Sequence, residues 1–417
     1  MTKSGGIVGD FVYRLLSHEE KLRKNITEEL TITRVDELIH KAIMLCASDI
    51  HVQPEEQYAR VRYRIDGILY DQESLPYQQY APIISRLKVL AALDIAQLRL
   101  PQDGKIRVEV SSKGNGQALT IDLRISTFPS MYGEKMVIRI LDRSQGVRTL
   151  QELGLADESL SRVKNIINNP HGFFLLTGPT GSGKSTTLYA LLANLNTAER
   201  NIVTMEDPVE YNISGIMQSQ VNIQAGFTFD NGLRCLLRQD PDVMMIGEIR
   251  DKTTVQIAIE AALTGHLVVS TLHTNDAPGA ITRLIDMGVE PFLINATVTG
   301  VLAQRLVRVL CNHCKLECAP YDGALQIAQQ YDAKLERLFQ ARGCAHCRQT
   351  GYKGRMGLFE LLVFDDQIRD LVIQKASCEK VRQQAIAASM ITLAQDGIAK
   401  INAGQISFED FLCVVGQ

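Results

Sequence analysis

The 417-residue chain lacks any long hydrophobic run: no stretch approaches the roughly 18–20 consecutive apolar residues that a helix needs to span a bilayer. Within its first residues, MTKSGGIVGDFVYRLLSHEEKLRKN, Asp10 and Arg14 break the apolar part, which argues against a signal peptide. Internal repeats and low-complexity segments are missing too. With 45% hydrophobic and 22% charged residues, the composition is that of an ordinary globular protein, and the length predicts two or three domains.

An excess of basic charge is also missing. The formal net charge is −3 at pH 7, whereas a protein dedicated to nucleic-acid binding usually has a basic balance. We therefore expect no stable nucleic-acid partner. Cysteines are scarce outside one segment, since five of the nine lie between Cys311 and Cys347. This clustering is typical of a metal site in a reducing compartment rather than of a disulfide framework, and it predicts a cytoplasmic protein.

The N-terminal third predicts a small α+β domain preceded by a helical extension. Residues 1–30 are polar, rich in charge and helical in character. Residues 31–142 contain an amphipathic helix and then ARVRYRIDGILYD, in which apolar residues alternate with Arg62 and Arg64 and an Asp-Gly pair supplies a hairpin turn. A helix in APIISRLKVLAAL and alternating strands in LTIDLRIST and KMVIRIL complete a domain of ordinary size.

A polar connection, residues 143–159, separates this domain from a larger one at 160–417. In the larger domain the short apolar runs GFFLLTG, NIVTMED, DVMMIGE and HLVVSTLH alternate with helical stretches. Continuous apolar strands with helices between them indicate an α/β domain with a parallel sheet covered on both faces. A cysteine-rich insert at 308–357 follows, and residues 358–417 have the pattern of amphipathic helices.

The segment GPTGSGKST fills every position of the pattern G-x-x-x-x-G-K-[ST], between the strand FFLLT and the helix STTLYALLANL. Glycines let the backbone curl so that successive N–H groups point at phosphate oxygens, and the helix N-terminus adds its positive end. Lys184 is expected to reach the β- and γ-phosphates, and the Ser185 hydroxyl to ligate Mg²⁺. The predicted ATP-binding residues are Gly178, Pro179, Thr180, Gly181, Ser182, Gly183, Lys184, Ser185 and Thr186.

Acidic residues end two of the predicted strands. Glu206 and Asp207 follow NIVTM, and Glu248 follows VMMIG. Ligands of a doubly wound sheet bind at the carboxyl ends of its strands, so on neighbouring strands these acids would meet the γ-phosphate. Hydrolysis needs a carboxylate for the attacking water and one for the metal, and Glu248 is long enough for either. We predict catalytic roles for Glu206 and Glu248, the latter also toward Mg²⁺, with capping of the next helix as the alternative.

Two histidines, His266 and His273, bracket the apolar strand in TGHLVVSTLHTNDA. A histidine at a strand end can hydrogen-bond the γ-phosphate and transmit its presence to the neighbouring helix. The alternative is a purely structural histidine, which is common at such positions. Both residues are therefore candidates for the catalytic site.

Two Cys-x-x-Cys pairs, Cys311 with Cys314 and Cys344 with Cys347, are separated by 29 residues. Each short loop lets two sulfurs meet one ion, and four thiolates close a tetrahedral zinc site that has no open position. A closed site is structural rather than catalytic. Cys318 is a possible substitute ligand, although the pairing disfavours it, and four unrelated buried thiols are the alternative to a metal site.

These motifs together resemble one family. GPTGSGKST, TMEDPVEY, LLRQDPDVMMIGEIRD, TGHLVVSTLHTNDA and LVRVLCNHC…GCAHCRQTGYKGRMGLFELL occur here in that order. They are similar to the motifs of secretion and type IV pilus assembly ATPases of the GspE/PilB type. The resemblance begins near ASDIHVQP and RYRIDG and runs almost to the C-terminus. It implies a RecA-like ATPase domain with an inserted zinc subdomain and C-terminal helices, preceded by a small PAS-like domain.

The resemblance further implies a homohexamer with ATP between the small domain and the RecA-like domain. In that arrangement DLRIST and VIRIL supply Arg124 and Arg139 to the γ-phosphate, whereas the residue pattern alone places both on exposed strand faces. Glu248 occupies the family's strand-end Glu position, with Glu206 as its companion. In two respects the chain departs from the family: it starts almost directly at the second N-terminal domain of many relatives, and Gln53 replaces their usual Glu.

The leading hypothesis is therefore a cytoplasmic ATPase motor, peripheral at the inner membrane. It would power assembly of a type IV pilus or a type II secretion pseudopilus through an inner-membrane platform protein. The four-cysteine insert favours assembly over the alternative of a pilus retraction motor, because retraction motors generally lack it. A zinc-containing nucleic-acid translocase, the hypothesis from another class, predicts salt-sensitive oligonucleotide binding and is disfavoured by the negative net charge.

Overall fold

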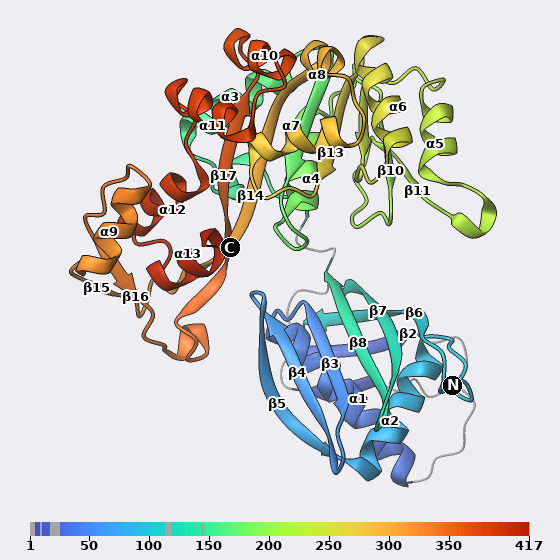
Figure 1. Ribbon diagram of the computed structural model, residues 1–417. Coiled ribbons are helices and arrows are strands. Elements are labelled where there is room, and N and C mark those ends of the chain that lie inside the picture. The colour runs from blue at the N-terminus through green and yellow to red at the C-terminus, as the bar shows by residue number, and fades with distance from the viewer. Residues whose placement is uncertain (1–4, 9–10, 17–25, 113–117, 143–145, 417) are drawn as a thin grey trace. The chain divides into compact units, whose positions relative to one another are not determined.

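The computed structural model divides into two compact units, Met1–Gly146 and Val147–Gln417 (Figure 1). The described residues are 5–8, 11–16, 26–112, 118–142 and 146–416. The division falls inside the stretch predicted as a connection, residues 143–159. The second half of that stretch is not a free linker, however, because Leu150 and Leu153 of a 3-10 helix are buried in the core of the second unit.

The first unit is an eight-stranded antiparallel sheet, in the order β1-β2-β6-β7-β8-β3-β4-β5, with two helices packed on one face. Its elements are β1 (Gly5–Val8), β2 (Phe11–Leu16), α1 (Ile26–Met44), β3 (Asp49–Pro54), β4 (Tyr58–Ile65), β5 (Ile68–Pro76), α2 (Tyr77–Leu90), β6 (Gln102–Ser112), β7 (Ala118–Ser130) and β8 (Gly133–Asp142).

Strand alternation sets the two faces of this sheet. On β4, Val61 and Tyr63 are fully buried against the helices, while Arg62 and Arg64 lie on the opposite face. The turn between β4 and β5 is a two-residue loop in which Asp66 and Gly67 have φ of 49° and 90°, the left-handed backbone of a type I′ turn. The predicted hairpin is thus confirmed.

The predicted helical character of residues 1–30 is wrong for part of that segment. Residues 5–8 and 11–16 form β1 and β2, and β2 pairs with β6 at the edge of the sheet. Glycine disfavours a helix and the β-branched and aromatic residues in GGIV and FVYRLL favour strands. Among the described residues, the first helix is α1, which begins at Ile26.

The second unit is built on a seven-stranded sheet in the order β11-β10-β12-β13-β9-β14-β17. Every neighbouring pair is parallel except β14 with β17. The strands are β9 (Gly172–Thr177), β10 (Ile202–Glu206), β11 (Met217–Gln220), β12 (Val243–Ile246), β13 (Leu267–Leu272), β14 (Val298–Leu310) and β17 (Tyr352–Val363).

Helices cover both faces of this sheet, as the sequence predicts. Phe173 and Leu175 of β9 pack into one core with α5 to α8, whereas Phe174 and Leu176 pack into another with α3 and α4. These helices are α3 (Asp157–Ile167), α4 (Lys184–Leu195), α5 (Phe229–Leu236), α6 (Lys252–Leu263), α7 (Ala277–Asp286) and α8 (Pro291–Thr297).

The strands β14 and β17 continue beyond the sheet as a two-stranded ribbon that carries the cysteine-rich insert (Figure 1). The insert runs between Leu310 and Tyr352, so both ends of the predicted 308–357 belong to the ribbon. The predicted helical part 358–417 likewise opens as strand, up to Val363, because the buried run GLFELL pairs with β14. The remaining elements are β15 (Leu316–Cys318), α9 (Asp322–Gln330), β16 (Leu338–Gln340), α10 (Asp366–Ile373), α11 (Cys378–Ala387), α12 (Leu393–Asn402) and α13 (Phe408–Val415).

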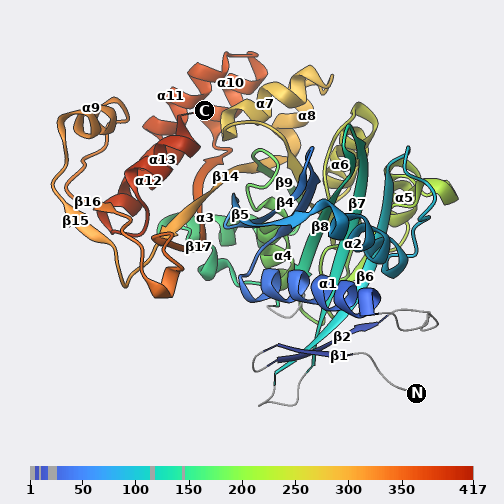
Figure 2. The same ribbon diagram turned by 90° about the horizontal axis from the view of Figure 1, so that it is seen from below.

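The C-terminal helices α12 and α13 lie beside the insert in both views (Figures 1 and 2). Arg308 of the ribbon anchors α13 through two hydrogen bonds to Asp410 Oδ1, from Nε at 2.8 Å and Nη2 at 2.6 Å. The insert and the C-terminus therefore form one packed extension of the sheet. Over the residues that the structure describes, no helix is long and apolar enough to cross a bilayer.

Candidate active site and metal centre

The phosphate loop joins the buried strand β9 to α4. Gly178, Gly181 and Gly183 have φ of 148°, 81° and 88°, a backbone that side chains with a Cβ rarely adopt. At Gly178 a Cβ would also lie 2.4 Å from the carbonyl oxygen of Gln304 and 2.6 Å from Ser182 Oγ. The loop is consequently closed tightly against β14 on one side.

Lys184 folds back over this loop. Its Nζ donates hydrogen bonds to the carbonyl oxygens of Gly178 at 2.7 Å and Pro179 at 3.1 Å, and the residue is 8% exposed. Burial lowers the pKa of Lys184 to about 8; the charge of Glu248 opposes this shift and that of Arg305 adds to it. Because its hydrogen bonds go to neutral carbonyls, the buried ammonium is only partly compensated, so an anion in the loop would be favourable.

The donor set of the loop fits a nucleotide polyphosphate with Mg²⁺. The Ser182 hydroxyl is buried without a hydrogen-bond partner among the described residues, so it is available to a phosphate oxygen. Ser185, in the first turn of α4, is exposed and offers the oxygen that Mg²⁺ prefers. When bound, Mg²⁺ would neutralise charge developing on the phosphates.

Glu248 lies at the same edge of the sheet, directly after β12. Its Oε1 accepts a hydrogen bond of 2.5 Å from Arg250 Nη2, and its Oε2 is 3.5 Å from His273 Nε2. The Glu248 side chain keeps 18% of its surface exposed. A partly exposed carboxylate near the loop lysine, with an arginine and a histidine in reach, can orient a water or hold a metal ion.

Backbone contacts between strand ends hold this edge together. The Gly247 N–H donates to the Met205 carbonyl at 2.8 Å, and the Ile249 N–H donates to the Thr271 carbonyl at 3.0 Å. Next to the loop, the hydroxyls of Thr177 and Thr274 are 2.6 Å apart. Each strand end is thereby fixed to its neighbour, so Glu248 and His273 start from a rigid base.

Glu206 is not part of this exposed group. It ends β10 next to β12, as predicted, but shares a strand face with Thr204, which turns its carboxylate under α4. The carboxylate accepts hydrogen bonds from Tyr189 Oη on α4, from Thr204 Oγ1 at 2.6 Å and from Gln218 Nε2 at 3.1 Å, and only 4% of the residue is exposed. The structure therefore corrects the expectation that both acids face the phosphate edge.

His266 lies at the wrong end of the sheet for catalysis. It precedes β13, and its carbonyl accepts the N–H of Gly172 at the amino end of β9, whereas the phosphate loop leaves the carboxyl end. Six strand residues, or about 20 Å, separate the two ends. Its ring Nδ1 is 2.9 Å from the Ala261 carbonyl oxygen, so His266 closes the α6–β13 loop. Of the two histidines, only His273 joins Glu248.

Three residues at this edge escaped the sequence analysis. Arg250 lies two positions after Glu248, and that i, i+2 spacing is a usable signal. Gln304 and Arg305 come from β14, whose place beside β9 depends on tertiary pairing. Gln304 accepts a hydrogen bond from the Thr187 hydroxyl at 2.7 Å, and Arg305 donates to the Asn275 carbonyl at 2.8 Å.

The predicted arginines Arg124 and Arg139 belong to the first unit, where they are register partners on β7 and β8. They line a hollow of about 560 Å³ on the face of the sheet opposite the helices. Lys105 and Asp103 of β6 and Ser126 of β7 also line it. Within this unit alone, the hollow is a cationic site suited to an anionic ligand.

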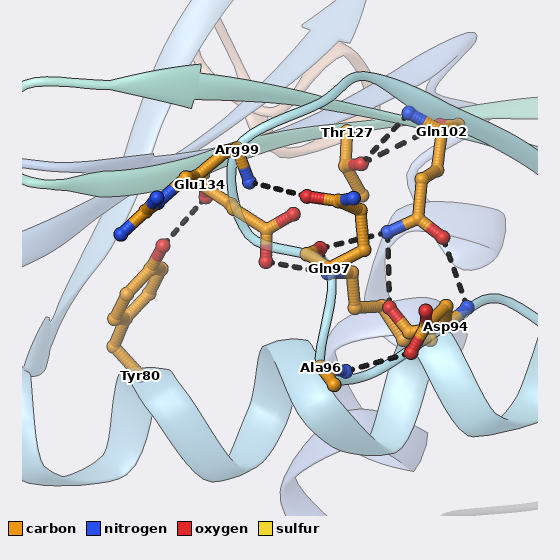
Figure 3. A network of polar contacts seen from close by, with 9 residues as sticks. Tyr80, Asp94, Ala96, Gln97, Arg99, Gln102, Thr127 and Glu134 are labelled. Carbon is orange, nitrogen blue, oxygen red and sulfur yellow. Dashed lines mark hydrogen bonds and ion pairs between the residues drawn. The ribbon is translucent and has the colours of Figure 1, made fainter.

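A polar network braces the loop that leads into β6 (Figure 3). Lys88 forms a buried ion pair of 2.7 Å with Glu134 and donates to the Gln97 carbonyl at 2.7 Å. The Gln102 side chain accepts from the Asp94 N–H at 2.9 Å and donates to the carbonyls of Asp94 and Gln97. Because β6 starts at Gln102, this bracing fixes the strand that carries Asp103 and Lys105 into the hollow.

The four predicted cysteine ligands converge at the end of the ribbon. The sulfurs of Cys311, Cys314, Cys344 and Cys347 all lie within 4.8 Å of one another. The Cys311–Cys344, Cys314–Cys347 and Cys344–Cys347 separations are 3.8, 3.7 and 3.7 Å. A tetrahedron with Zn–S bonds of about 2.3 Å has edges of about 3.8 Å, so the cluster fits zinc.

Backbone donors prepare this cluster for thiolates. Burial raises the pKa of the Cys347 thiol, but the N–H groups of Cys344 and Gly351, at 3.1 and 3.2 Å from its sulfur, and the contacts with the Cys344 and Cys314 sulfurs together lower the pKa to about 6. Such N–H···S bonds favour the charged form that ligates metals. Cys318, on β15, is outside the cluster, in agreement with the pairing that disfavoured it.

Comparison with known proteins now decides the family. The model of a family described as "Type II/IV secretion system protein" matches residues 25–413. The chain belongs to this family. It is a secretion-family ATPase, which agrees with its complete phosphate loop.

Relatives with curated names agree. Type II secretion system protein HxcR of Pseudomonas aeruginosa is 49% identical over 92% of this chain and 77% of its own length. Type II secretion system ATPase E of Vibrio cholerae is 44% identical over 96% and 78%. The type IV pilus assembly ATPase PilB of Thermus thermophilus is 45% identical over 97% of this chain but only 45% of its own length. Secretion and pilus members are thus about equally similar to this chain.

Solved structures confirm the RecA-like fold. The ATPase DotB of Legionella pneumophila superposes with a TM-score of 0.67 at 22% identity, over 95% of this chain and 97% of its own. The pilus retraction motor PilT with bound ADP gives a TM-score of 0.59 at 26% identity, over 90% and 95%. The likeness covers both units, the α+β unit and the RecA-like α/β unit, since each alignment spans at least 90% of this chain.

Proposed function

We propose that this secretion-family ATPase is a homohexameric motor that hydrolyses ATP to drive assembly of a type IV pilus or a type II secretion pseudopilus. It would act on an inner-membrane platform protein and lie at the inner membrane through such partners. The observation that carries the proposal is the juxtaposition of Lys184 with Glu248, His273 and Arg250 at one sheet edge. Identities of 44–49% to secretion and pilus assembly proteins support the choice of process.

In this proposal each residue of the edge has one task. The loop N–H groups, Ser182 and Lys184 bind the β- and γ-phosphates, and Ser185 holds Mg²⁺. Glu248 orients the attacking water and accepts its proton, while Arg250 holds the carboxylate in place through its hydrogen bond to Oε1. His273, 3.5 Å from Glu248, senses the γ-phosphate.

Three further assignments complete the proposal. Glu206 has a structural role: its hydrogen bond with Tyr189 joins β10 to α4, the helix that begins with Lys184. Arg124 and Arg139 contact the γ-phosphate from the first unit, and a pair of arginines that arrives on closure can contribute on the order of 10³–10⁵ in rate. Zinc fills the four-cysteine cluster and has a structural role, because four thiolates leave no open position.

A retraction motor is the second candidate, favoured by the likeness to PilT. The tetracysteine cluster, together with the higher identity to assembly proteins, weighs against it. Deletion of the gene distinguishes the two candidate functions. Cells that lose an assembly motor should have no fibres, whereas cells that lose a retraction motor should have longer or more numerous fibres.

The test of hydrolysis is Lys184→Ala in the purified full-length protein. We expect loss of ATPase activity by more than a hundredfold, because the β/γ-phosphate contact is lost. Lys380→Ala, at an exposed position on α11, is the matched control and should keep wild-type activity. In cells, only the Lys184 variant should fail to assemble fibres. An active Lys184→Ala protein would rule the proposal out.

A further inference from the structure

A row of charged residues crosses five neighbouring strands of the first unit. In register order they are Arg64 on β4, Asp49 on β3, Arg139 on β8, Arg124 on β7 and Lys105 on β6. Like charges directly opposite each other destabilise a sheet. Three of these cations, Arg139, Arg124 and Lys105, line the hollow together with Asp103.

Asp49 is the fixed member of this row. Its side chain is 11% exposed, and its Oδ2 accepts a hydrogen bond of 2.8 Å from Ser48 Oγ. Its Oδ1 is 3.3 Å from Arg139 Nε, and its Oδ2 is 3.6 Å from Arg64 Nε. Arg139, by contrast, keeps 61% of its side chain exposed. A buried, hydrogen-bonded carboxylate thus holds one edge of an exposed, solvent-facing guanidinium.

The contact uses only one of the guanidinium's five N–H donors. Asp49 takes Nε, and within the part of the chain that the structure describes the four N–H donors on the two Nη atoms have no hydrogen-bond acceptor, so they are available to another one. Because Arg139 lines the hollow, that acceptor would lie there, beside Arg124 and Lys105. With a carboxylate held at Nε, the planar guanidinium is already oriented when an anion arrives at its Nη atoms.

We propose that Asp49 is a positioning residue for Arg139, which it orients toward the phosphate that the hollow receives. This inference rests on the proposed function, since it assumes that Arg139 contacts the γ-phosphate. Asp49 itself touches no substrate. It acts by restricting where the guanidinium can be, so that fewer rotamers must be lost when the phosphate binds in the transition state.

The negative charge of Asp49 and its positioning of Arg139 predict different changes in kcat and KM when Asp49 is replaced. As a plain negative charge beside a cationic hollow, Asp49 repels an anionic substrate, so its removal should lower KM and leave kcat unchanged. As a positioning residue, its removal should lower kcat, because Arg139 is no longer held where charge develops. The sign of the effect therefore distinguishes the two roles.

The experiment measures kcat and KM for Mg-ATP in the full-length protein carrying Asp49→Asn, Arg139→Ala, or both. We expect Asp49→Asn to lower kcat about three- to tenfold without raising KM. Asp49→Glu, which keeps the charge but moves the carboxylate by one methylene, should lower kcat less. In the Arg139→Ala background neither change should lower kcat further, because the interaction that it disturbs is already gone. Circular dichroism and native mass verify folding and assembly.

Each outcome decides the matter. If Asp49→Asn leaves kcat unchanged, the inference is wrong. It is also wrong if Asp49→Asn lowers kcat equally with and without Arg139. The loss would then come through the other arginine near Asp49, and Arg64→Ala should reproduce it. If Asp49→Asn does not fold, the Asp49→Glu comparison in the two backgrounds carries the same test. If Arg139→Ala is fully active, the proposed role of Arg139 fails and the inference falls with it, whereas Lys184→Ala still reports on the proposed function separately.

Discussion

Lys184 shows how one side chain can couple nucleotide binding to a proton. Burial places its pKa at about 8 in the nucleotide-free chain, below the ordinary lysine value. A bound polyphosphate favours the charged form, so it should raise this pKa again. Binding should therefore take up a proton between about pH 8 and pH 10, and affinity should fall as the pH rises through that window.

Calorimetric titration of a non-hydrolysable ATP analogue checks this, run at pH 8.5 in two buffers of different ionisation enthalpy. The apparent binding enthalpies should differ in proportion to the protons taken up. Lys184→Arg, whose guanidinium stays charged at this pH, is the matched variant and should abolish the difference. A wild-type protein without buffer dependence would mean that Lys184 is already fully charged before binding.

At Glu248, replacement of the carboxylate separates binding from chemistry. Glu248→Gln keeps the shape but cannot accept a proton, so kcat should fall by about a hundred- to a thousandfold while nucleotide affinity changes little. Glu206→Gln is the informative companion, because its carboxylate is buried among Tyr189, Thr204 and Gln218. We expect that variant to unfold at lower urea concentration. Steady-state kinetics and urea unfolding of both variants decide between these roles.

Sequence reasoning at the residue scale succeeded where chemistry follows local spacing. The phosphate loop and the paired cysteines are defined by neighbours in the chain, and the structure brings both sets together. Glu206 and His266 are different. Their roles depend on which strand face or strand end a residue occupies, and a one-residue shift or the direction of a strand decides that. Arg305 depends on a strand pairing that no local pattern encodes.

The element that carries the cysteine cluster should depend on its metal. Structural zinc contributes folding free energy directly, and here the cluster closes the end of the β14–β17 ribbon on which α13 packs. Cys347→Ser should lose about one equivalent of zinc and lower Tm by several degrees. Cys318→Ser, in the same insert but outside the cluster, should keep both. Metal analysis and thermal unfolding measure the two effects; retained zinc in the Cys347 variant would contradict the assignment.

Elements were predictable when their residues repeat with a clear period. The β4–β5 hairpin and the buried strands of the second unit follow from alternation and from apolar runs. The strands β1 and β2 were predicted as helical because each strand is short and the sequence that follows them is rich in charge, which obscures their β-forming residues. The strand β17 was misread as the start of a helical part, since a fully buried strand and a buried helix share the same apolar run.

At the scale of the whole molecule, the site proposed for hydrolysis takes residues from both units, and in the proposed hexamer association of subunits would complete it. Specific ATPase activity should therefore rise with protein concentration over a hundredfold range, as subunits associate and complete the site. Native mass measured over the same range tests the cause. Constant activity in a protein that stays monomeric would mean that one chain completes the site without a partner.

The phosphate loop is rigidly joined to β14, because Gln304 packs closely against the loop. The Gln304 carbonyl blocks a Cβ at Gly178, and its side chain holds the Thr187 hydroxyl of α4, which leaves no slack between loop and strand. From Gln304 the strand β14 runs on to Leu310, about 20 Å further at the usual rise per residue. A tilt of about ten degrees at Gln304 would move the cysteine-bearing end by roughly 3 Å. A small movement of the phosphate loop at Gln304 would therefore produce a larger displacement at the cysteine-bearing end of the ribbon.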